Sequence, residues 1–403
     1  MRNIFEDAPL PADEPQHLLP SGGQAAWWTG PGTLPLRYGD RYLPGNRLEL
    51  YGSGGQAFGE MLQAIAAARE TVHLETYRLA SDKTGWRFCE ALCAKAKGAR
   101  VRLIYDSLGS RGLSSVMVTR LRNSGVQLLE YHPVSPWRSR GAWGRRDHRK
   151  LLVVDGRIAF AGSLNISDEH APASEGGQGW RDAHVKVEGR AAREIDALFR
   201  EVWTRETGRS CDLAPVPSPA GNSYVWPAAN QEILHRYHIR SSYLAAIRSA
   251  RKEVLLAHAY FLPDQRFRRA LASAAKRGVS VRILVPGASD VPPVWYASRA
   301  GYGALLRRGV RLFEWKGPIL HSKVAVVDRL WTAIGSYNID HRSLRHNLEI
   351  NLHVLDADFA SRVAELIEGD IGRSAEITRE KWRLRGWTHR AFERFFAMFR
   401  YLF

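Results

Sequence analysis

The sequence HRKLLVVD at residues 148–155 returns as HSKVAVVD at residues 321–328, and this repetition indicates a duplicated fold. Each final aspartate is followed by six residues and then a Gly-Ser-x-Asn segment, GSLN at 162–165 and GSYN at 335–338. Side chains two apart on a strand point to the same face, so each histidine shares a face with its lysine, and the apolar residues after them predict a buried strand. Six residue types at fixed spacing, present twice, are far more specific than a lone His-x-Lys, which would usually be an ordinary core or surface pair.

The sequence around the two motifs is duplicated as well. AIAAARETV at 64–72 resembles AIRSARKEV at 246–254, KGARVRLI at 97–104 resembles RGVSVRIL at 277–284, and LRNSGVQLLEY at 121–131 resembles LRRGVRLFEW at 306–315. In the first copy, strand patterns at 47–51, 71–77, 101–106 and 126–131 alternate with helical patterns at 58–68, 85–97 and 116–123. This alternation predicts an α/β fold built of two homologous halves.

Composition places the boundaries of these halves. Residues 1–45, rich in Pro and Gly, read as an N-terminal arm, and DLAPVPSPAGNSYVWP at 212–227 reads as part of a linker. We therefore predict halves at 46–207 and 228–370, a linker at 208–227 and a C-terminal segment at 371–403. Two duplicated halves are expected to pack as a pseudo-dimer, with their matching sites at the shared interface.

The duplicated residues suit the cleavage of a phosphodiester. That reaction needs a nucleophile, a proton for the leaving alcohol and positive charge around the phosphoryl oxygens. Two histidines supply the nucleophile and the acid through a covalent phosphohistidine, while lysines and asparagines hold the oxyanion. We predict as catalytic His148, Lys150, Asp155, His321, Lys323 and Asp328, and as phosphate-binding Ser163, Asn165, Ser336 and Asn338. The lysines supply the charge and no carboxylate cluster suits Mg²⁺ or Ca²⁺, so neither a metal nor a cofactor is expected.

Each catalytic histidine also needs an acceptor that orients its other ring nitrogen. Asp155 and Asp328 stand far along their strands from the histidines, and a structural role for both is the alternative. Two further acids lie downstream of the motifs, Asp182 in GWRDAHV and Glu349 in RHNLEIN. We expect Asp182 to orient His148 and Glu349 to orient His321, each within its own half.

These residues resemble the phospholipase D superfamily, and within it the shorter bacterial cardiolipin synthases that lack N-terminal transmembrane helices. The segments HAYFLP at 258–263, NIDHRS at 338–343 and NLE at 347–349 are especially similar, and the resemblance covers about 46–403. It implies two phospholipase D-like α/β sandwich halves with a shared active site at their interface. It also implies transfer of a phosphatidyl group from one phosphatidylglycerol to another with release of glycerol, with His148 as nucleophile and His321 as general acid. The symmetry of the sequence alone leaves those two roles open.

The charge of the chain points to a polyanionic partner. Lys and Arg number 58 against 41 Asp and Glu, a net charge of +17, which suits nucleic acid or an anionic membrane surface. WRSRGAWGRRDHRK at 137–150 could steer anionic headgroups with Trp137 and Trp143 at the interface, stack on bases, or be a solvated loop. Residues 381–403 read as an interfacial amphipathic helix, with packing on the core as the alternative. The predicted membrane-binding residues are Trp382, Trp387, Arg390, Phe395, Phe396 and Phe399.

The sequence shows no signal peptide and no apolar run of ~20 residues, and its three cysteines do not suggest a disulfide framework. Together with the resemblance, this predicts a peripheral enzyme on the cytoplasmic side of the bacterial inner membrane. Its expected partners are an anionic phospholipid membrane and phosphatidylglycerol, with no nucleic acid. A phospholipase D-type hydrolase, a metal-independent nuclease and a non-catalytic binder of anionic membranes are the alternatives, and the oligomeric state stays open.

Overall fold

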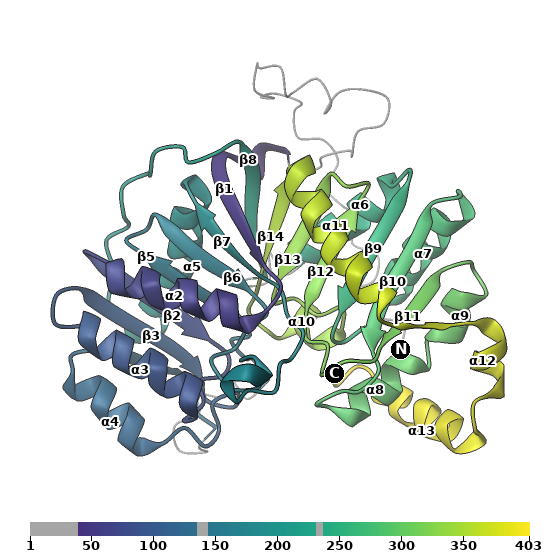
Figure 1. Cartoon of the computed structure of the whole chain (residues 1–403), viewed down its shortest axis with the longest axis horizontal. Helices are drawn as coiled ribbons and strands as arrows, with labels where there is room; N and C mark the ends of the chain where they lie inside the picture. The colour runs from purple at the N-terminus through teal and green to yellow at the C-terminus, as the bar shows by residue number, and fades with distance from the viewer. Residues whose placement is uncertain (1–38, 135–143, 231–236) are drawn as a thin grey trace.

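A computed structural model describes residues 39–134, 144–230 and 237–403, and the strands of these residues form one long sheet (Figure 1). The strand order is β15-β11-β10-β9-β12-β13-β14-β8-β1-β7-β6-β5-β2-β3-β4. The first-half strands are β1 (Leu43–Tyr51), β2 (Thr71–Thr76), β3 (Arg100–Asp106), β4 (Gln127–Tyr131), β5 (Lys150–Val154), β6 (Ile158–Gly162) and β7 (His184–Glu188). The second-half strands are β8 (Ser223–Asn230), β9 (Glu253–His258), β10 (Ser280–Pro286), β11 (Arg311–Trp315), β12 (Lys323–Val327), β13 (Trp331–Gly335), β14 (Glu349–Leu355) and β15 (Ala375–Ile377).

The sheet has the same order on both sides of its centre. β1 pairs with β8 in the middle, and the strands then run outward as β7-β6-β5-β2-β3-β4 in one direction and β14-β13-β12-β9-β10-β11 in the other. β2 is parallel to β3 and antiparallel to β5, and β9 has the same relation to β10 and β12. The prediction of two homologous α/β halves is therefore confirmed.

Helices cover both faces of this sheet (Figure 1). The longer ones are α2 (Gly54–Ala67), α3 (Lys83–Lys95), α4 (Ser115–Asn123), α5 (Arg190–Thr207), α6 (His238–Ser249), α7 (Gln265–Lys276), α8 (Pro292–Arg299), α11 (Ala357–Gly372) and α13 (Trp387–Met398), and the short ones are α9 (Tyr302–Leu306), α10 (His341–Arg345) and α12 (Arg379–Leu384). The helices and strands predicted for the first half are present at the expected places, with ends that differ by a few residues. Within the described ranges, no helix combines the length and the apolarity needed to cross a membrane.

Most of the buried apolar side chains gather in two outer cores and one central core. The first-half strands pack with α2, α3 and α4, and the second-half strands pack with α6, α7 and α9. The central core takes strands from both halves together with α5 and α11. β5 and β12, which carry LLVV and VAVV, are buried along their whole length, as their unbroken apolar runs predict.

Two boundaries differ from those expected from composition. β1 begins at Leu43, inside the segment predicted as an arm, and β8 begins at Ser223, inside the segment predicted as a linker. These two strands pair with each other at the centre of the sheet and join its two halves, so residues near both boundaries take part in the fold. Residues 1–38 of the predicted arm lie outside the described residues.

Candidate active site

Both histidine-lysine pairs lie at equivalent ends of the sheet. Lys150 opens β5 opposite Thr76, the last residue of β2, and Lys323 opens β12 opposite His258, the last residue of β9. The carboxyl ends of parallel strands are where open α/β sheets place their ligands. The fold therefore places the histidine-lysine pair of each half at the same edge of the sheet, the functional edge of that half.

Backbone bridges between the halves then bring the two edges together. The His148 N–H donates to the Leu348 carbonyl at 3.0 Å, and the Leu348 N–H donates to the Arg146 carbonyl at 2.8 Å. In the other direction, the His321 N–H donates to the Arg181 carbonyl at 2.8 Å. The backbone at His148 is thus bonded to Leu348, the residue before Glu349. The backbone at His321 is bonded to Arg181, the residue before Asp182.

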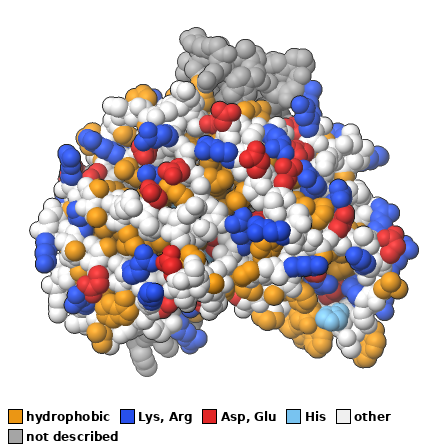
Figure 2. Space-filling model, viewed as in Figure 1, with side chains coloured by type: hydrophobic (Ala, Val, Ile, Leu, Met, Phe, Trp, Pro, Cys, Tyr) orange, Lys and Arg blue, Asp and Glu red, His pale blue; other side chains and the backbone are white. Residues whose placement is uncertain are grey.

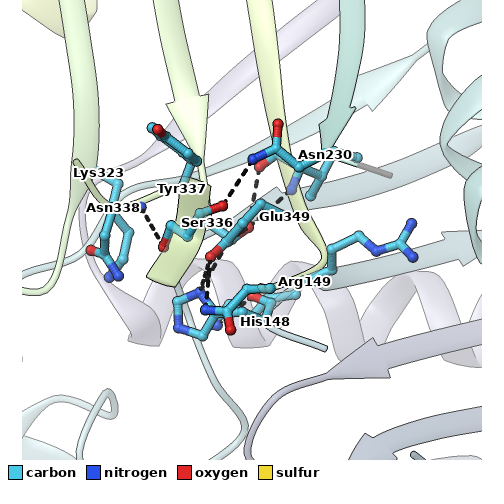
Figure 3. A network of polar contacts seen from close by, with 12 residues as sticks. His148, Arg149, Asn230, Lys323, Ser336, Tyr337, Asn338 and Glu349 are labelled. Atoms are coloured by element: carbon cyan, nitrogen blue, oxygen red, sulfur yellow. Dashed lines mark hydrogen bonds and ion pairs between the residues drawn. The ribbon is translucent and has the colours of Figure 1, made fainter. Parts of the chain in front are cut away.

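This bridging crosses the acid–histidine pairs. Both carboxylate oxygens of Glu349, at the start of β14, lie 3.0 Å from His148 Nδ1 (Figure 3). Asp182 Oδ1 lies 2.9 Å from His321 Nδ1. The expected pairing of Asp182 with His148 and of Glu349 with His321 is therefore wrong, although each acid does contact the Nδ1 of a motif histidine. Sequence distance suggested partners within one half, but the backbone bridges place each acid beside the other half's histidine.

The two lysines are buried beside these pairs. Lys150 Nζ donates to the His148 carbonyl at 2.6 Å, and Lys323 Nζ donates to the His321 carbonyl at 2.5 Å. Burial lowers the pKa of Lys150 to about 7, against the attraction of Glu349, and lowers the pKa of Lys323 to about 8, against the attraction of Asp182. Because burial brings both ammonium groups close to deprotonation, a bound anion would stabilise their charged forms.

Burial also fixes the state of the acids and imidazoles. Burial and the charges of Lys150 and Lys323 hold the pKa of His148 well below its usual range, and burial with Lys323 lowers the pKa of His321 to about 3. Burial raises the pKa of Glu349 to about 7, partly offset by Lys150. Burial would also raise the pKa of Asp182, but nearby imidazoles outweigh it and hold that pKa well below the usual range. Both motif histidines are therefore neutral at pH 7, as a nitrogen nucleophile must be.

The motif serines contact the strands that carry the two acids. Ser336 Oγ donates to Glu349 at 2.5 Å and accepts from the Ile350 N–H at 3.0 Å (Figure 3). Ser163 Oγ donates to the Ala183 carbonyl at 3.1 Å. Both serines are fully buried, as are Lys150 and Lys323, and the phosphate-binding role of Ser163 and Ser336 stays a prediction. Asn165 and Asn338 are buried at the same edge, and each has a side-chain oxygen with no protein partner among the described residues.

Asp155 and Asp328 lie at the opposite ends of β5 and β12 from the lysines. Asp155 accepts from the backbone N–H groups of residues 69–71 at 2.8–2.9 Å, just before β2 begins. Asp328 accepts from those of residues 251–253 at 2.8–2.9 Å, just before β9. Both have a φ of 53°, the left-handed conformation that Asp tolerates better than most residues. Their predicted catalytic role is corrected to a structural one, which was the alternative.

Three further side chains at the site were missed from sequence. The His170 imidazole donates from Nδ1 to Asp182 Oδ2 at 2.5 Å. The rings of Tyr77 and Trp180 lie 5.1 Å from His148 and 5.7 Å from His321 respectively, and form aromatic walls. A signal for His170 does exist in the sequence, because it stands five residues after Asn165 where the second copy of the motif has Ser343 after Asn338.

One cluster of side chains could hold a metal ion. Within residues 39–134, 144–230 and 237–403, this cluster is formed by His170, Asp182 and His321. Each of the three offers one possible ligand atom, and these atoms all lie within 4.8 Å of one another. Hydrogen bonds between the two imidazoles and the carboxylate already account for these contacts. The expectation that the chemistry needs neither metal nor cofactor stays a prediction.

The C-terminal segment carries exposed aromatic side chains beside the site. Hydrophobic side chains gather over α13 at the lower right of Figure 2, and the exposed ones include Leu384, Trp387, Phe392, Phe395, Met398, Phe399, Tyr401 and Leu402. The chain end returns to the second motif, because the Arg342 N–H of α10 donates to the Phe403 carbonyl at 2.9 Å. This aromatic surface therefore borders the functional edge of the second half.

Two of the predicted membrane-binding residues turn inward. Trp382 is buried, with its ring 5.6 Å from that of Tyr302, and the guanidinium of Arg385 lies 4.0 Å from its ring, so its predicted membrane contact is wrong. Phe396 is half-buried and stacks on Tyr296 of α8 at 5.8 Å. Trp387, Arg390, Phe395 and Phe399 are exposed as predicted. Trp137 and Trp143, expected at the membrane interface, lie outside the described residues.

Comparison with known proteins agrees with this geometry. A family described as "Cardiolipin synthase, PLD-like domain" matches residues 61–203 and 243–371. The chain is 34% identical over 346 residues to a cardiolipin synthase of Halalkalibacterium halodurans, covering 84% of this chain and 69% of that one. It is 31% identical to one from Staphylococcus aureus, covering 84% and 70%.

Solved structures support the fold. The crystal structure of the phosphatidylserine synthase of Haemophilus influenzae Rd KW20 is similar with a TM-score of 0.68 at 12% identity, covering 88% of this chain and 95% of that one. The family match covers both halves of the chain, in agreement with the duplicated motifs, the single large sheet and the crossed acid–histidine pairs. The chain belongs to the phospholipase D-like family of cardiolipin synthases.

Proposed function

We propose that this chain is a cardiolipin synthase, which transfers a phosphatidyl group from one phosphatidylglycerol to the headgroup hydroxyl of another and releases glycerol. The observation that carries the proposal is the pair of crossed acid–histidine contacts with a buried lysine beside each, in a chain of this family. Two imidazoles, each oriented by a carboxylate, supply the nucleophile and the proton donor that a two-step phosphoryl transfer requires.

In the first step, His148 acts as the nucleophile. Its Nδ1–H donates to Glu349, so Nε2 is left with a free electron pair that attacks phosphorus. The bond between phosphorus and the glycerol oxygen breaks, and His321 donates its Nε2 proton to that oxygen. Glycerol leaves, and the phosphatidyl group remains on His148 as a phosphohistidine.

In the second step, the now neutral His321 acts as a base. It takes the proton from the terminal hydroxyl of a second phosphatidylglycerol, whose oxygen attacks phosphorus and breaks the phosphorus–nitrogen bond. Cardiolipin forms, His148 returns to its neutral state and His321 regains the proton it gave away. Each atom and proton is accounted for by the two lipids alone.

Substrate charge prepares His321 for this role. Burial and Lys323 lower its pKa to about 3. A phosphodiester between the two lysines brings a negative charge, which raises the pKa of the imidazole and restores full charge to Lys150 and Lys323. The acid therefore becomes protonated when the substrate that needs the proton is bound.

The aromatic surface of α12, α13 and the chain end supports access from a membrane. Trp387, Phe395 and Phe399 are exposed, with Arg390 on the same helix. Apolar rings with arginines suit the boundary between acyl chains and anionic headgroups, and the surface adjoins the second motif. We propose peripheral attachment to an anionic phospholipid membrane, on the cytoplasmic side of a bacterial inner membrane.

Product analysis with phosphatidylglycerol vesicles tests the proposed function. Wild type is expected to produce cardiolipin and free glycerol in equal amounts, and His148→Ala neither. Phosphatidic acid as the main product would make the protein a phospholipase D-type hydrolase. If no lipid product forms, single-stranded and double-stranded DNA become the substrates to test, and the lipid proposal fails.

A further inference from the structure

Arg342 is a cation beside the active site that takes no part in either step of the proposed transfer. It lies on α10, which begins after Asp340 and is found where the two halves meet (Figure 1). The turn after α10 is bonded to the first half, because Leu348 exchanges backbone hydrogen bonds with residues 146–148. On α10 itself, the Arg342 N–H donates to the Phe403 carbonyl at 2.9 Å. These contacts fix the backbone of Arg342 beside the first motif.

The charge of Arg342 acts on the active site. Burial, the two motif lysines and then Arg342 hold the pKa of His148 well below its usual range. Burial and Asp106 raise the pKa of Tyr77, and Arg342 opposes that rise. The Tyr77 ring itself lies 5.1 Å from that of His148. The Arg342 side chain is half-buried, and among the described residues no carboxylate forms an ion pair with its guanidinium. Arg342 therefore adds a positive charge on the His148 side of the site that no ion pair neutralises.

The matching position of the first half is neutralised instead. Glu169 stands four residues after Asn165, as Arg342 stands four residues after Asn338. The Glu169 Oε1 lies 2.8 Å from the guanidinium of Arg78. The first half therefore has an acid paired with a base at this position, whereas the second half has an arginine without such a partner.

Cardiolipin synthesis brings two phosphodiesters into the site together. In the proposed reaction, the donor phosphodiester reacts with His148 and lies between Lys150 and Lys323. The acceptor carries a phosphodiester of its own at the far end of the glycerol whose hydroxyl attacks, so a second negative charge lies one glycerol away from the reacting phosphorus. An anion that loses its water on binding needs a cation close by. The planar fork of an arginine suits it, because it can donate two parallel hydrogen bonds to phosphate oxygens.

We propose that Arg342 binds the phosphodiester of the acceptor phosphatidylglycerol, and so selects an anionic lipid headgroup over water or a neutral alcohol as the acceptor. The inference rests on the proposed function, because it concerns the second lipid of that reaction. The two lysines then serve the donor phosphodiester, and Arg342 serves that of the acceptor. Since water and glycerol lack the charge that Arg342 binds, this contact favours transfer over hydrolysis.

Two soluble acceptors that compete for one donor isolate this contact. The donor is phosphatidyl-p-nitrophenol, from which His148 displaces p-nitrophenolate, a stable anion that needs no proton from the protein. The acceptors are glycerol and glycerophosphoglycerol, the deacylated form of phosphatidylglycerol, which has a terminal glycerol hydroxyl and a phosphodiester. Both acceptors attack the same phosphohistidine, so the ratio of the two lipid products gives the ratio of their kcat/KM values and does not depend on the rate of the first step. We expect wild type to favour glycerophosphoglycerol roughly 30-fold, within the range for a hydrogen bond to a charged group.

Variants of α10 assign the preference to one side chain. Arg342→Gln removes the charge and the fork but keeps a good helix former, and should bring the product ratio to about one. Arg342→Lys keeps the charge without the fork and should leave an intermediate ratio of roughly five. As a matched control, Arg345→Gln removes the same charge from an exposed position of the same helix and should keep the wild-type ratio. Formation of either lipid product shows that a variant is folded.

Three results would overturn the acceptor site. They are a wild-type ratio near one, which needs no variant, a ratio unchanged in Arg342→Gln, and an equal fall in the ratio in Arg345→Gln. Failure of the proposed function looks different, because wild type would then convert the donor to phosphatidic acid alone with both acceptors present, and would make no cardiolipin from phosphatidylglycerol vesicles. Transfer to glycerol therefore persists in the first kind of failure and is absent in the second.

Discussion

The two halves repeat one feature closely and differ in another. Asp155 and Asp328 hold matching turns, with the same φ and the same three backbone contacts at 2.8–2.9 Å. The acids at the site differ, because Asp182 serves two imidazoles and Glu349 serves one together with a serine. The turns have the same contacts in both halves, whereas the two histidines have opposite roles in the proposed reaction. Comparing the halves therefore separates what folds the chain from what the reaction requires.

The largest expected effect comes from removing each histidine. His148→Ala and His321→Ala should each lower cardiolipin synthesis by about 10⁴-fold or more, as knockouts of a nucleophile or its partner acid do. With phosphatidyl-p-nitrophenol, His321→Ala should still form a phosphohistidine on His148, while His148→Ala forms none. Intact-protein mass spectrometry after acid-free quenching measures this. A covalent adduct on His321 in the His148→Ala variant would show that the halves are interchangeable.

The second half carries an aromatic surface at α13 that the first half does not match in the described residues. Trp387→Ala with Phe395→Ala should weaken binding to anionic vesicles roughly 100-fold, since burial of each such ring contributes about 1.5–3 kcal/mol. Vesicle sedimentation measures this change, and the turnover of a short-chain soluble phosphatidylglycerol should stay within about threefold. As a control, Val116→Ala removes an exposed apolar side chain of the first half and should leave vesicle binding unchanged. Unaltered binding of the double variant would contradict the docking surface.

The lowered pKa values of the two lysines predict how kcat/KM changes on the alkaline side of its pH profile. Burial lowers the pKa of Lys150 from 10.5 to about 7, so its charge is present below pH 7 and is lost as pH rises. kcat/KM for phosphatidylglycerol should therefore fall by about tenfold per unit above that pH, as expected for the loss of one required proton. Lys150→Arg should move this limb to higher pH because arginine keeps its charge. Lys323→Arg should move it less, since the pKa of Lys323 is already about 8. A limb that stays in place in both variants would exclude the lysines as its cause.

The turn aspartates give the smallest effect on activity. Asparagine tolerates positive φ as aspartate does. In Asp155→Asn and Asp328→Asn, however, an amide NH₂ group replaces one of the two oxygens that accept from backbone N–H groups. Each should lower the free energy of unfolding by about 1–2 kcal/mol, with kcat/KM within about threefold of wild type. Urea midpoints and steady-state assays at 25 °C compare the two variants. A large loss of activity at an unchanged midpoint would restore these residues to the catalytic set.

Much of the fold and of the site could be predicted from the sequence. The duplicated strand and helix patterns gave both halves, and LLVV and VAVV are the buried strands that their unbroken apolar runs indicate. The histidines, lysines and both orienting acids were also found. Local patterns suffice for such features, because strand alternation and motif spacing are properties of short segments.

Features that depend on distant segments were missed. The exchange of Asp182 and Glu349 follows from backbone bridges between residues about 140–200 apart, which no local pattern reports. Trp382 has the composition of a membrane anchor but packs on Tyr302, because tertiary contacts decide which aromatic side chains stay exposed. His170 is visible only when the two motif copies are aligned past their shared residues.

The crossing of the two acid–histidine pairs defines this site, and NMR of the imidazole nitrogens can detect it. With ¹⁵N-labelled histidine, Glu349→Gln should shift the Nδ1 resonance of His148 and leave that of His321 in place. Asp182→Asn should shift His321 and His170 together and leave His148 unchanged. Shifts in the reverse pattern, with each acid affecting the histidine of its own half, would contradict a shared active site built across the interface.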